Sequence, residues 1–255
     1  MPELPEVETI KRNLEPNVIG KIISDIKMLS PKNFIGNKNY VIGRKIIDVK
    51  RYGKVLVIKL STIHRPLIAN HYLNIHFKLS GQMLFAKNVN NARYKFKIPF
   101  TKGSIMPANT TRVIIEFKDK SGLFFNDLRK FGWIKLSKKP LIPKGVDVLS
   151  KDFTARYLKG ILKTTKRNIK TVLMDQDLVT GIGNIYANDS LFLAKINPLR
   201  SADSLVDKEV DTLYKKILQE IDRGIKDKGS SGADEAFILP DGSKGRHQRN
   251  FLVYQ

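Results

Sequence analysis

The first half of the chain alternates short apolar runs with residues that form turns. The runs are rich in β-branched and aromatic residues, and turn formers such as those from Asp119 to Gly122 separate them. This pattern is typical of strands, and several short strands in succession predict a β-sandwich or barrel. The expected strands lie within 21–29, 45–60, 73–85, 111–119 and 123–136. Ahead of them, Pro5 followed by acidic residues predicts the first turn of a helix.

The second half of the chain changes to helical periodicity. Between 207 and 226, apolar residues recur at steps of three and four, which places them on one face of a helix. They are Val210, Leu213, Ile217, Ile221 and Ile225. Three shorter helices are expected within 152–162, 168–179 and 184–194. From Gly229 onward, a segment rich in Gly, Ser and Asp predicts a flexible loop before a short terminal strand at 251–254.

A Pro- and Lys-rich stretch from Ser137 to Ser150 separates the two patterns, and we interpret it as a linker. The whole predicts an α+β protein, in which an N-terminal β-sandwich domain with a leading helix precedes a helical domain. The expected divisions are 1–136 for the β-sandwich domain, 137–150 for the linker, 151–228 for the helical domain and 229–255 for the loop and terminal strand.

The net charge of the chain indicates which class of molecule it binds. The chain has 46 Lys and Arg against 24 Asp and Glu, a net charge of +22. Such an excess attracts polyanions, above all the phosphate backbone of nucleic acids, and a DNA-binding and an RNA-associated protein fit it equally well. Cysteine is absent, which excludes disulfides and thiolate metal sites. No apolar run reaches membrane-spanning length, so we expect a cytoplasmic protein without a membrane partner.

The N-terminus carries the most specific chemistry. The first ten residues contain Glu3, Glu6 and Glu8 and no basic residue. The helix dipole accounts for acidic residues at a helix N-terminus, but it does not account for Pro2. Once Met1 is removed, Pro2 presents a secondary amine with a pKa of about 8, against about 10.4 for lysine, so far more of it is unprotonated near neutral pH. A secondary amine that attacks an aldehyde-level carbon forms an iminium, which acts as an electron sink.

Several segments, in the same order, resemble the formamidopyrimidine-DNA glycosylase and endonuclease VIII family. They are MPELPEVETI, RYGKVLVI, IHFKLSGQM, NDLRKFGW, GVDVLS and IKTVLMDQDLVTGIGNIYANDSLF. The resemblance is closest to the formamidopyrimidine-DNA glycosylase branch. It implies a bifunctional DNA glycosylase and AP lyase of base excision repair, with a helix–two-turn–helix (H2TH) domain that binds DNA and a lesion-recognition loop within 229–255.

The same resemblance implies which residues are catalytic. Pro2 would attack C1′ of the damaged nucleotide, and Glu3 would protonate the sugar ring oxygen or the base and later relay protons. Lys54, within RYGKVLVI, would serve as an acid in β-elimination. Glu6 is included in this catalytic group.

The family also fills the space that a flipped base leaves in the duplex, because unstacking costs a few kcal/mol unless something replaces the base. The matching positions are Leu79, Arg129 and Phe131, an apolar wedge, a planar cation and an aromatic ring. Gly181 and Gly183 are expected to let a phosphate approach the amides at the start of a helix. Further DNA contacts are expected from His76, Thr110, Lys166, Lys170 and Asn184.

Family members continue into a four-cysteine zinc finger or a metal-free equivalent, whereas this chain ends at Gln255 without a cysteine. We therefore expect no zinc and no other cofactor. The resemblance favours oxidised purines (formamidopyrimidine and 8-oxoguanine) as substrates. Alternatives are an oxidised-pyrimidine glycosylase of the endonuclease VIII type and a catalytically idle protein that binds damaged DNA. The expected partner is double-stranded DNA with oxidised bases or abasic sites, bound by a monomer at the nucleoid.

Overall fold

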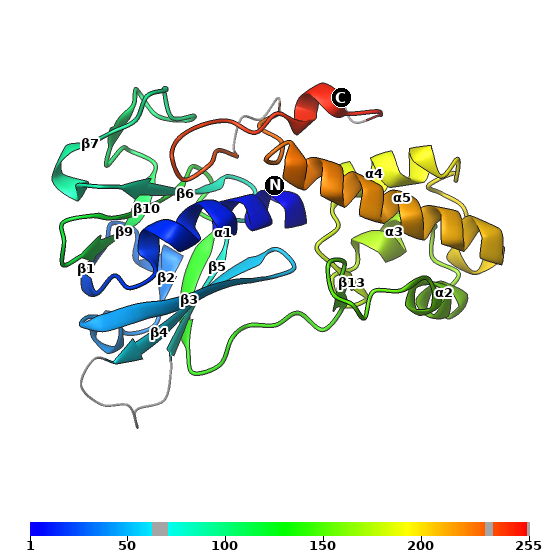
Figure 1. The fold of residues 1–255 in the computed structure, drawn as a ribbon, viewed down its shortest axis with the longest axis horizontal. Coiled ribbons are helices and arrows are strands. Elements are labelled where there is room, and N and C mark those ends of the chain that lie inside the picture. The colour runs from blue at the N-terminus through cyan, green and yellow to red at the C-terminus, as the bar shows by residue number, and fades with distance from the viewer. Residues whose placement is uncertain (63–70, 233–236, 254–255) are drawn as a thin grey trace.

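A leading helix joins the two parts of the molecule. The computed structural model describes residues 1–62, 71–232 and 237–253, and α1 spans Leu4–Val18. Its start is fixed by Pro5 in the first turn and by the Glu6 carboxylate, which accepts the N–H of Glu3 at 2.9 Å. Its apolar face is buried against the β-sheets, while its N-terminal end lies beside the long helix of the second domain (Figure 1).

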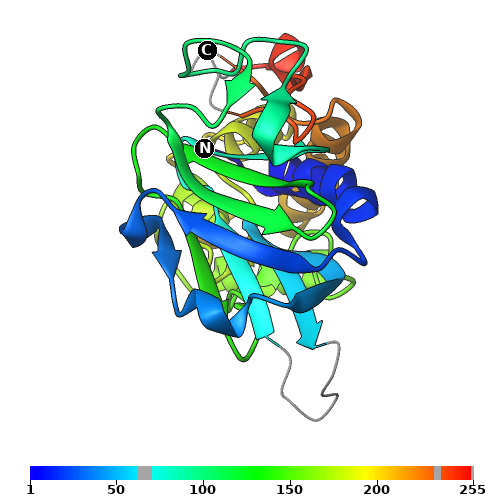
Figure 2. The ribbon, with the colours of Figure 1, turned by 90° about the vertical axis from the view of Figure 1, so that its left-hand side faces the viewer.

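Two antiparallel-rich sheets form the N-terminal domain. One has the strand order β1-β9-β10-β6 and the other the order β2-β11-β5-β4-β3. Figure 2 shows the strands from the side of this domain. The strands are β1 (Ile23–Met28), β2 (Phe34–Ile35), β3 (Arg44–Tyr52), β4 (Val55–Thr62), β5 (His71–His76), β6 (Gly81–Ala86), β7 (Ala92–Arg93), β8 (Ile105–Met106), β9 (Thr111–Phe117), β10 (Gly122–Asp127) and β11 (Trp133–Ser137). Short 3-10 helices are η1 (Pro31–Asn33), η2 (Lys38–Tyr40) and η3 (Val89–Asn91).

One hydrophobic core is shared by both sheets and α1. It includes Ile10 from α1, Val113 and Phe125 from one sheet, and Ile58 and Leu73 from the other, all with at most 1% of their surface exposed. The alternation of buried and exposed residues along most of β3 is the pattern expected of a strand with one face on a core. Strand β9 is covered on both faces, because Val113 and Ile115 join this core and Ile114 joins a second cluster. The predicted β-rich first half with a leading helix is confirmed.

The second domain is helical. Its elements are β12 (Val146–Asp147), α2 (Ala155–Lys163), α3 (Ile169–Met174), β13 (Val179–Thr180), α4 (Asn184–Leu193), η4 (Ala202–Ser204), α5 (Asp207–Lys226) and η5 (His247–Asn250). Helices α2 and α3 begin at side-chain caps, since Thr154 accepts the N–H of Tyr157 and Asn168 accepts that of Thr171. The predicted stripe on α5 is confirmed, because Val210, Leu213 and Ile217 are buried in the core of this domain.

The structure corrects two predicted elements. The helix expected over 168–179 ends at Met174, because Asp175 accepts the N–H of Asp177 in a turn and Val179–Thr180 pairs in parallel with Val146–Asp147. The expected terminal strand is not formed over 251–253, where backbone N–H groups donate to the Asp189 carboxylate instead of to a strand. Tyr254 lies outside the described residues.

The segment predicted as a flexible loop from Gly229 is largely packed where it is described. Phe237 and Leu239 join the core of the β-sheets, and Ile238 joins a separate cluster beneath the β7–β8 region. Residues 233–236 lie outside the described part of the chain. Within that described part, no helix combines the length and the apolar character needed to cross a bilayer.

Candidate active site and DNA-binding surface

The first turn of α1 docks onto the turn between α3 and α4. The N–H of Leu4 donates to the carbonyl of Gly181 at 3.0 Å. Glu3 is 3% exposed, and its carboxylate accepts the N–H groups of Gly183 at 2.6 Å and Ile185 at 2.9 Å. A carboxylate from the first helix therefore caps α4 of the other domain, where the helix dipole favours negative charge.

The two glycines of this turn make the close approach possible. Gly181 has φ of +110°, and a Cβ there would lie 2.5 Å from Cδ1 of Leu4. A Cβ at Gly183 would lie 2.4 Å from the carboxyl carbon of Glu3. The sequence predicted that the two glycines let a phosphate reach the backbone amides at the start of α4. This prediction is wrong for the amides of Gly183 and Ile185, because the Glu3 carboxylate already accepts the hydrogen bonds of both N–H groups.

Glu6 connects three segments that are distant in sequence. One of its oxygens accepts the N–H of Glu3, and the other accepts the hydroxyl of Tyr186 and the N–H of Ser230, each at 2.9 Å. Its side chain is 1% exposed. Glu6 thereby fixes the start of α1 against α4 and against the segment that follows α5.

Lys54 faces these glutamates from the turn between β3 and β4. It is 6% exposed, and burial lowers the pKa of its ammonium group, although the charges of Glu3 and Glu6 oppose the shift. Burial also raises the pKa of Glu3 to about 7, against the opposing effects of Lys54 and the two amides. Pro2 is buried directly before Glu3. The structure thus gathers the four predicted catalytic residues and gives two of them perturbed proton affinities.

Arg51, three residues before Lys54, holds this turn in place. Its guanidinium binds both oxygens of Asp147, at 2.7 and 3.0 Å, and also Glu8 of α1 at 3.0 Å. The N–H of Gly53 donates to the same Asp147 carboxylate at 2.7 Å. A buried guanidinium with a bidentate partner is held in one orientation. Arg51 therefore anchors the β3–β4 hairpin both to α1 and to the interdomain segment.

The three predicted wedge residues lie on two adjacent loops and are exposed. Leu79 is 40% and Phe131 is 60% exposed, and Arg129 is exposed between them in sequence order. Each loop contains a lysine in the left-handed region, Lys78 at φ +52° and Lys130 at +59°. Large apolar side chains held in solvent by such turns are available to a partner.

A buried carboxylate ties the two wedge loops together. Asp127, 1% exposed at the end of β10, accepts the hydroxyl of Ser80 from the first loop. It also accepts the N–H of Arg129 at 3.2 Å and that of Gly132 at 2.7 Å from the second loop. The backbones below the wedge side chains are therefore fixed even though the side chains are not covered.

The remaining predicted DNA contacts are dispersed. Lys166 is exposed, and Lys170 and Asn184 are half-buried on the neighbouring helices α3 and α4. His76 accepts the N–H of Lys78 at Nδ1, and burial together with nearby lysines lowers its pKa to about 4, so its neutral ring presents Nε2–H. Thr110 is 2% exposed in the turn that precedes β9, so the structure does not bring its side chain to the surface for a DNA contact.

Sequence reasoning did not single out several residues that build this site. Arg51, Asp127 and Tyr186 stand inside the segments already noted, but only their neighbours were assigned roles.

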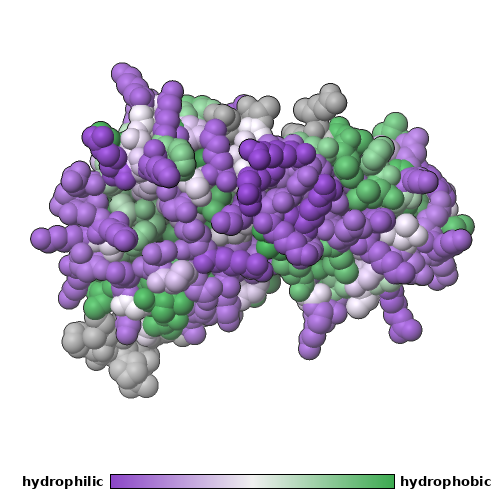
Figure 3. Space-filling view, turned by 45° about the horizontal axis from the view of Figure 1, so that its top comes forward, coloured by the Kyte–Doolittle hydropathy of each residue, from purple (hydrophilic) through white to green (hydrophobic). Residues whose placement is uncertain are grey.

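Figure 3 shows one face of the molecule, on which hydrophilic side chains predominate and hydrophobic ones form separate patches. The excess of 46 Lys and Arg over 24 Asp and Glu is what favours a polyanionic partner.

Comparisons with known proteins agree with this geometry. Residues 1–134 match the formamidopyrimidine-DNA glycosylase N-terminal domain, and residues 144–235 match the formamidopyrimidine-DNA glycosylase H2TH domain. The formamidopyrimidine-DNA glycosylase of Carboxydothermus hydrogenoformans is 35% identical over 100% of this chain and 88% of its own length.

Solved structures give the same result. The MutM (Fpg) protein from Thermus thermophilus has a TM-score of 0.82 at 30% identity, covering 99% of this chain and 87% of that protein. Lactococcus lactis Fpg, in a complex with DNA containing N7-benzyl-Fapy-dG, has a TM-score of 0.80 at 28% identity, covering 99% and 88%. The chain, with its β-sheet domain, its leading helix and its H2TH domain, therefore belongs to the formamidopyrimidine-DNA glycosylase family of DNA repair glycosylases.

Proposed function

We propose that this protein is a bifunctional DNA glycosylase and AP lyase that excises oxidised purines from double-stranded DNA. Pro2 is the nucleophile, Glu3 and Lys54 transfer protons, and Leu79, Arg129 and Phe131 fill the emptied stack. The observation that carries this proposal is the buried first turn of α1, where Glu3 and Lys54 face each other beside Pro2.

The reaction begins at the nitrogen of Pro2 once Met1 has been removed. This nitrogen forms a bond to C1′, the glycosidic bond breaks, and the base leaves with the bonding electrons and a proton. The C1′–O4′ bond then breaks, O4′ keeps the bonding electrons and takes a proton from Glu3, and the lone pair of the nitrogen forms the C1′=N⁺ bond of an open-chain iminium. The iminium acidifies C2′. Loss of a C2′ proton then expels the 3′ phosphate, which completes β-elimination and cleaves the strand.

The perturbed groups suit these proton transfers. A carboxyl group with a pKa of about 7 is partly protonated near neutral pH, so Glu3 can donate a proton and take it back. Lys54, whose ammonium pKa is lowered by burial, donates more readily than an ordinary lysine. Glu6 contacts no reacting atom in this scheme and holds the backbone of Glu3 in position.

The substrate class rests on likeness and on surface chemistry. The Lactococcus lactis relative was solved with DNA that contains a modified formamidopyrimidine nucleotide. When a base flips out, it leaves a gap in the duplex. In this chain, the exposed Leu79 and Phe131 supply the apolar and aromatic surfaces that can fill this gap. The net charge of +22 supplies long-range attraction to duplex DNA. We propose that a monomer binds.

Borohydride trapping with peptide mapping tests the nucleophile. The protein, confirmed by mass spectrometry to begin at Pro2, is mixed with a duplex that contains one abasic site and reduced with borohydride. We expect a covalent adduct whose deoxyribose remnant maps to the N-terminal peptide. An adduct that maps to a lysine, Lys54 included, would show that the nucleophile is wrong.

Cleavage assays on matched duplexes test the substrate. One duplex carries 8-oxoguanine, one carries an oxidised pyrimidine, and one is undamaged. We expect faster cleavage of the purine lesion. Preferential cleavage of the pyrimidine lesion favours the endonuclease VIII type of activity, and salt-sensitive binding without any cleavage of the first two duplexes identifies a damaged-DNA-binding protein instead.

A further inference from the structure

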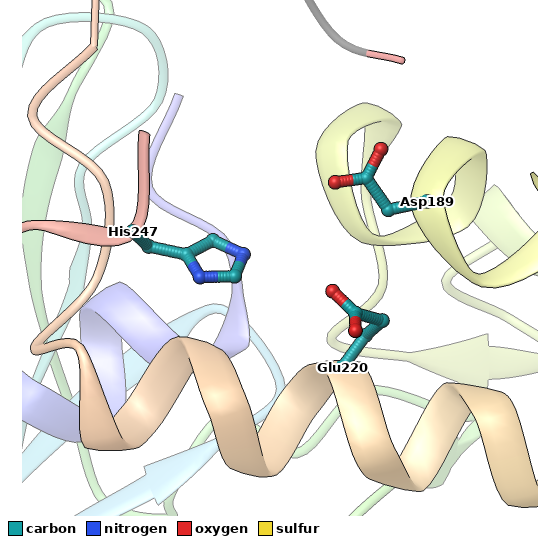
Figure 4. Close-up of side chains that lie close together, drawn as sticks. All are labelled: Asp189, Glu220 and His247. Atoms are coloured by element: carbon teal, nitrogen blue, oxygen red, sulfur yellow. The ribbon is translucent and has the colours of Figure 1, made fainter. Parts of the chain in front are cut away.

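Three buried side chains outside the active site converge between α4, α5 and η5. They are Asp189, Glu220 and His247, and each has an exposed fraction of 0%. One ligand-type atom from each lies within 4.8 Å of the others. Figure 4 shows the carboxylates of Asp189 and Glu220 facing each other, with the ring of His247 on the same side of α5. Buried charged groups of this kind are rare unless they are paired or coordinate a metal.

Two of the three side chains in this cluster, Glu220 and His247, have polar atoms without hydrogen bonds. Among the described residues, neither oxygen of Glu220 makes one, and Nε2 of His247 makes none either. Glu220 has an ion pair with Arg223, whose Nη1 lies 3.5 Å from Oε1, but the geometry is not that of a hydrogen bond. Leaving such groups buried and unsatisfied is costly, so the cluster calls for a further partner.

The other polar atoms of the cluster, Nδ1 of His247 and the Asp189 carboxylate oxygens, have hydrogen-bond partners. Nδ1 of His247 lies 3.0 Å from a carboxylate oxygen of Asp227, which favours the tautomer with the proton on Nδ1 and leaves the lone pair of Nε2 free. The Asp189 carboxylate accepts the N–H groups of Leu252 and Val253, each at 3.2 Å. A histidine oriented by a carboxylate, with its other nitrogen free, is the usual arrangement around a bound transition metal.

We propose that Asp189, Glu220 and His247 bind a divalent transition-metal ion, with zinc as the best match. One imidazole nitrogen and two carboxylates form a ligand set that zinc accepts at about 2.0–2.2 Å. Ligand atoms around one tetrahedral zinc lie roughly 3.3–3.6 Å apart. The three atoms lie within 4.8 Å of one another, so the most distant pair would close by up to about 1.3 Å when the ion binds, a movement that rotation of the carboxylate side chains can supply. Calcium and magnesium prefer oxygen ligands alone, which disfavours them beside an imidazole.

The ion would be structural. It would neutralise two buried carboxylates and join α4, α5 and the segment after α5 at one point. The expectation of no zinc rested on the absence of cysteine. That reasoning excludes thiolate sites and leaves this nitrogen and oxygen site open. The rival explanation is a proton shared within the cluster, in which Glu220 stays neutral because burial raises the pKa of its carboxyl group.

Zinc titration separates the two explanations. The full-length protein is stripped with a chelator and titrated with zinc by calorimetry, and bound metal is counted by plasma mass spectrometry. We expect one equivalent, and a rise in Tm of about 5–10 °C when zinc is a hundred times above Kd. Glu220→Gln and His247→Gln should abolish this binding, whereas Asp222→Asn, which changes an exposed carboxylate on the same helix, should leave it unchanged.

Two further measurements protect the test against variants that fail to fold. Cobalt added to the stripped wild-type protein should give the visible absorption of a coordinated ion and lose it when zinc is added. Asp227→Asn, which alters the partner of His247 without removing a ligand, should weaken zinc binding about 10- to 100-fold. Absence of stoichiometric binding by the wild-type protein, or binding that persists in Glu220→Gln and His247→Gln, overturns the proposal.

Discussion

The first turn of α1 and the wedge loops are both assigned to DNA chemistry, yet they are built in opposite ways. In the first turn, Glu3 and Glu6 are at most 3% exposed and every carboxylate oxygen accepts a hydrogen bond. In the wedge loops, Leu79 and Phe131 stand in solvent, and only the backbone beneath them is fixed by Asp127. Proton transfer requires groups with set positions and shifted pKa values, whereas a wedge must be free to enter another molecule.

The difference means that substitutions in the two regions should separate stability from function. Changes in the first turn should alter both, because the same carboxylates cap α4 and carry the chemistry. Changes to a wedge side chain should alter DNA binding and leave the fold intact. Asp127 provides the intermediate case, since it is buried like the first turn but supports the wedge.

The largest effect is expected for Glu3→Gln on strand cleavage. The amide keeps the size of the side chain but cannot donate and recover a proton, so single-turnover cleavage of an abasic duplex should fall about 10²- to 10⁴-fold. Glu15→Gln serves as the control, because Glu15 is on the same helix, is 37% exposed and pairs only with Lys11 among the contacts seen. Cleavage within a few-fold of wild type in Glu3→Gln would remove Glu3 from the mechanism.

The next effect concerns stability against pH. Burial raises the pKa of Glu3 from 4.5 in the unfolded reference to about 7, so the folded state favours the protonated form. The contribution of Glu3 to stability is therefore fully present below about pH 4.5 and is lost as the pH rises through about 7, a change of up to about 3 kcal/mol. Urea unfolding of wild type and Glu3→Gln at pH 5, 6, 7 and 8 measures it.

In that series, the free energy of unfolding of wild type should fall relative to that of Glu3→Gln as the pH rises. The Gln variant supplies the reference for all other titrating groups. Parallel curves across this pH range would mean that Glu3 is ionised throughout, held so by Lys54 and the amides of α4.

A somewhat smaller loss of stability is expected for Asp127→Ala. The substitution leaves the hydroxyl of Ser80 and the buried N–H of Gly132 without their acceptor, which should lower the free energy of unfolding by about 2–3 kcal/mol. Urea denaturation provides the measurement. The exposed Asp152 is the control, and Asp152→Ala should stay within about 0.5 kcal/mol. Equal effects of the two substitutions would contradict the role of Asp127 as the tie between loops.

The smallest effect is expected for Phe131→Ala. Its ring is 60% exposed, so the free energy of unfolding should change by less than about 0.5 kcal/mol. Affinity for a duplex with an abasic site should fall about tenfold, since stacking on an aromatic side chain contributes about 1–3 kcal/mol. Phe96→Ala is matched, because Phe96 is 48% exposed near the β7–β8 hairpin. Fluorescence anisotropy with labelled duplexes should show a change for the first variant alone.

Much of the fold could be predicted from the sequence because the local signals agreed with the final packing. The stripe on α5 matched its buried face, and the turn residues matched the strand ends in the first half. The resemblance in MPELPEVETI and RYGKVLVI assigned Glu3, Glu6 and Lys54 to one site, and the structure brings these three residues close enough for their charges to interact.

The rest could not be predicted because it depends on contacts between distant segments. Nothing local to Gly183 reveals that a glutamate 180 residues away occupies its amide. The strand predicted at 251–253 is absent for the same reason. An apolar run predicts a strand, but here the N–H groups of Leu252 and Val253 donate to the carboxylate of Asp189, which is distant in sequence. Glu220 and His247 gave no signal in the sequence, because Glu220 occurs in an ordinary amphipathic helix and His247 in a polar segment, and no spacing links the two.

The burial of Pro2 and Glu3 between two domains has a practical consequence for anyone who handles this protein. A purification tag, a reporter fusion or a retained formyl group ahead of Pro2 would consume the reactive nitrogen and would also have to be accommodated beside the junction of α1 with α4. Recombinant material made in that way would look inert and somewhat unstable for reasons unrelated to its native behaviour. Any affinity handle belongs elsewhere on the chain.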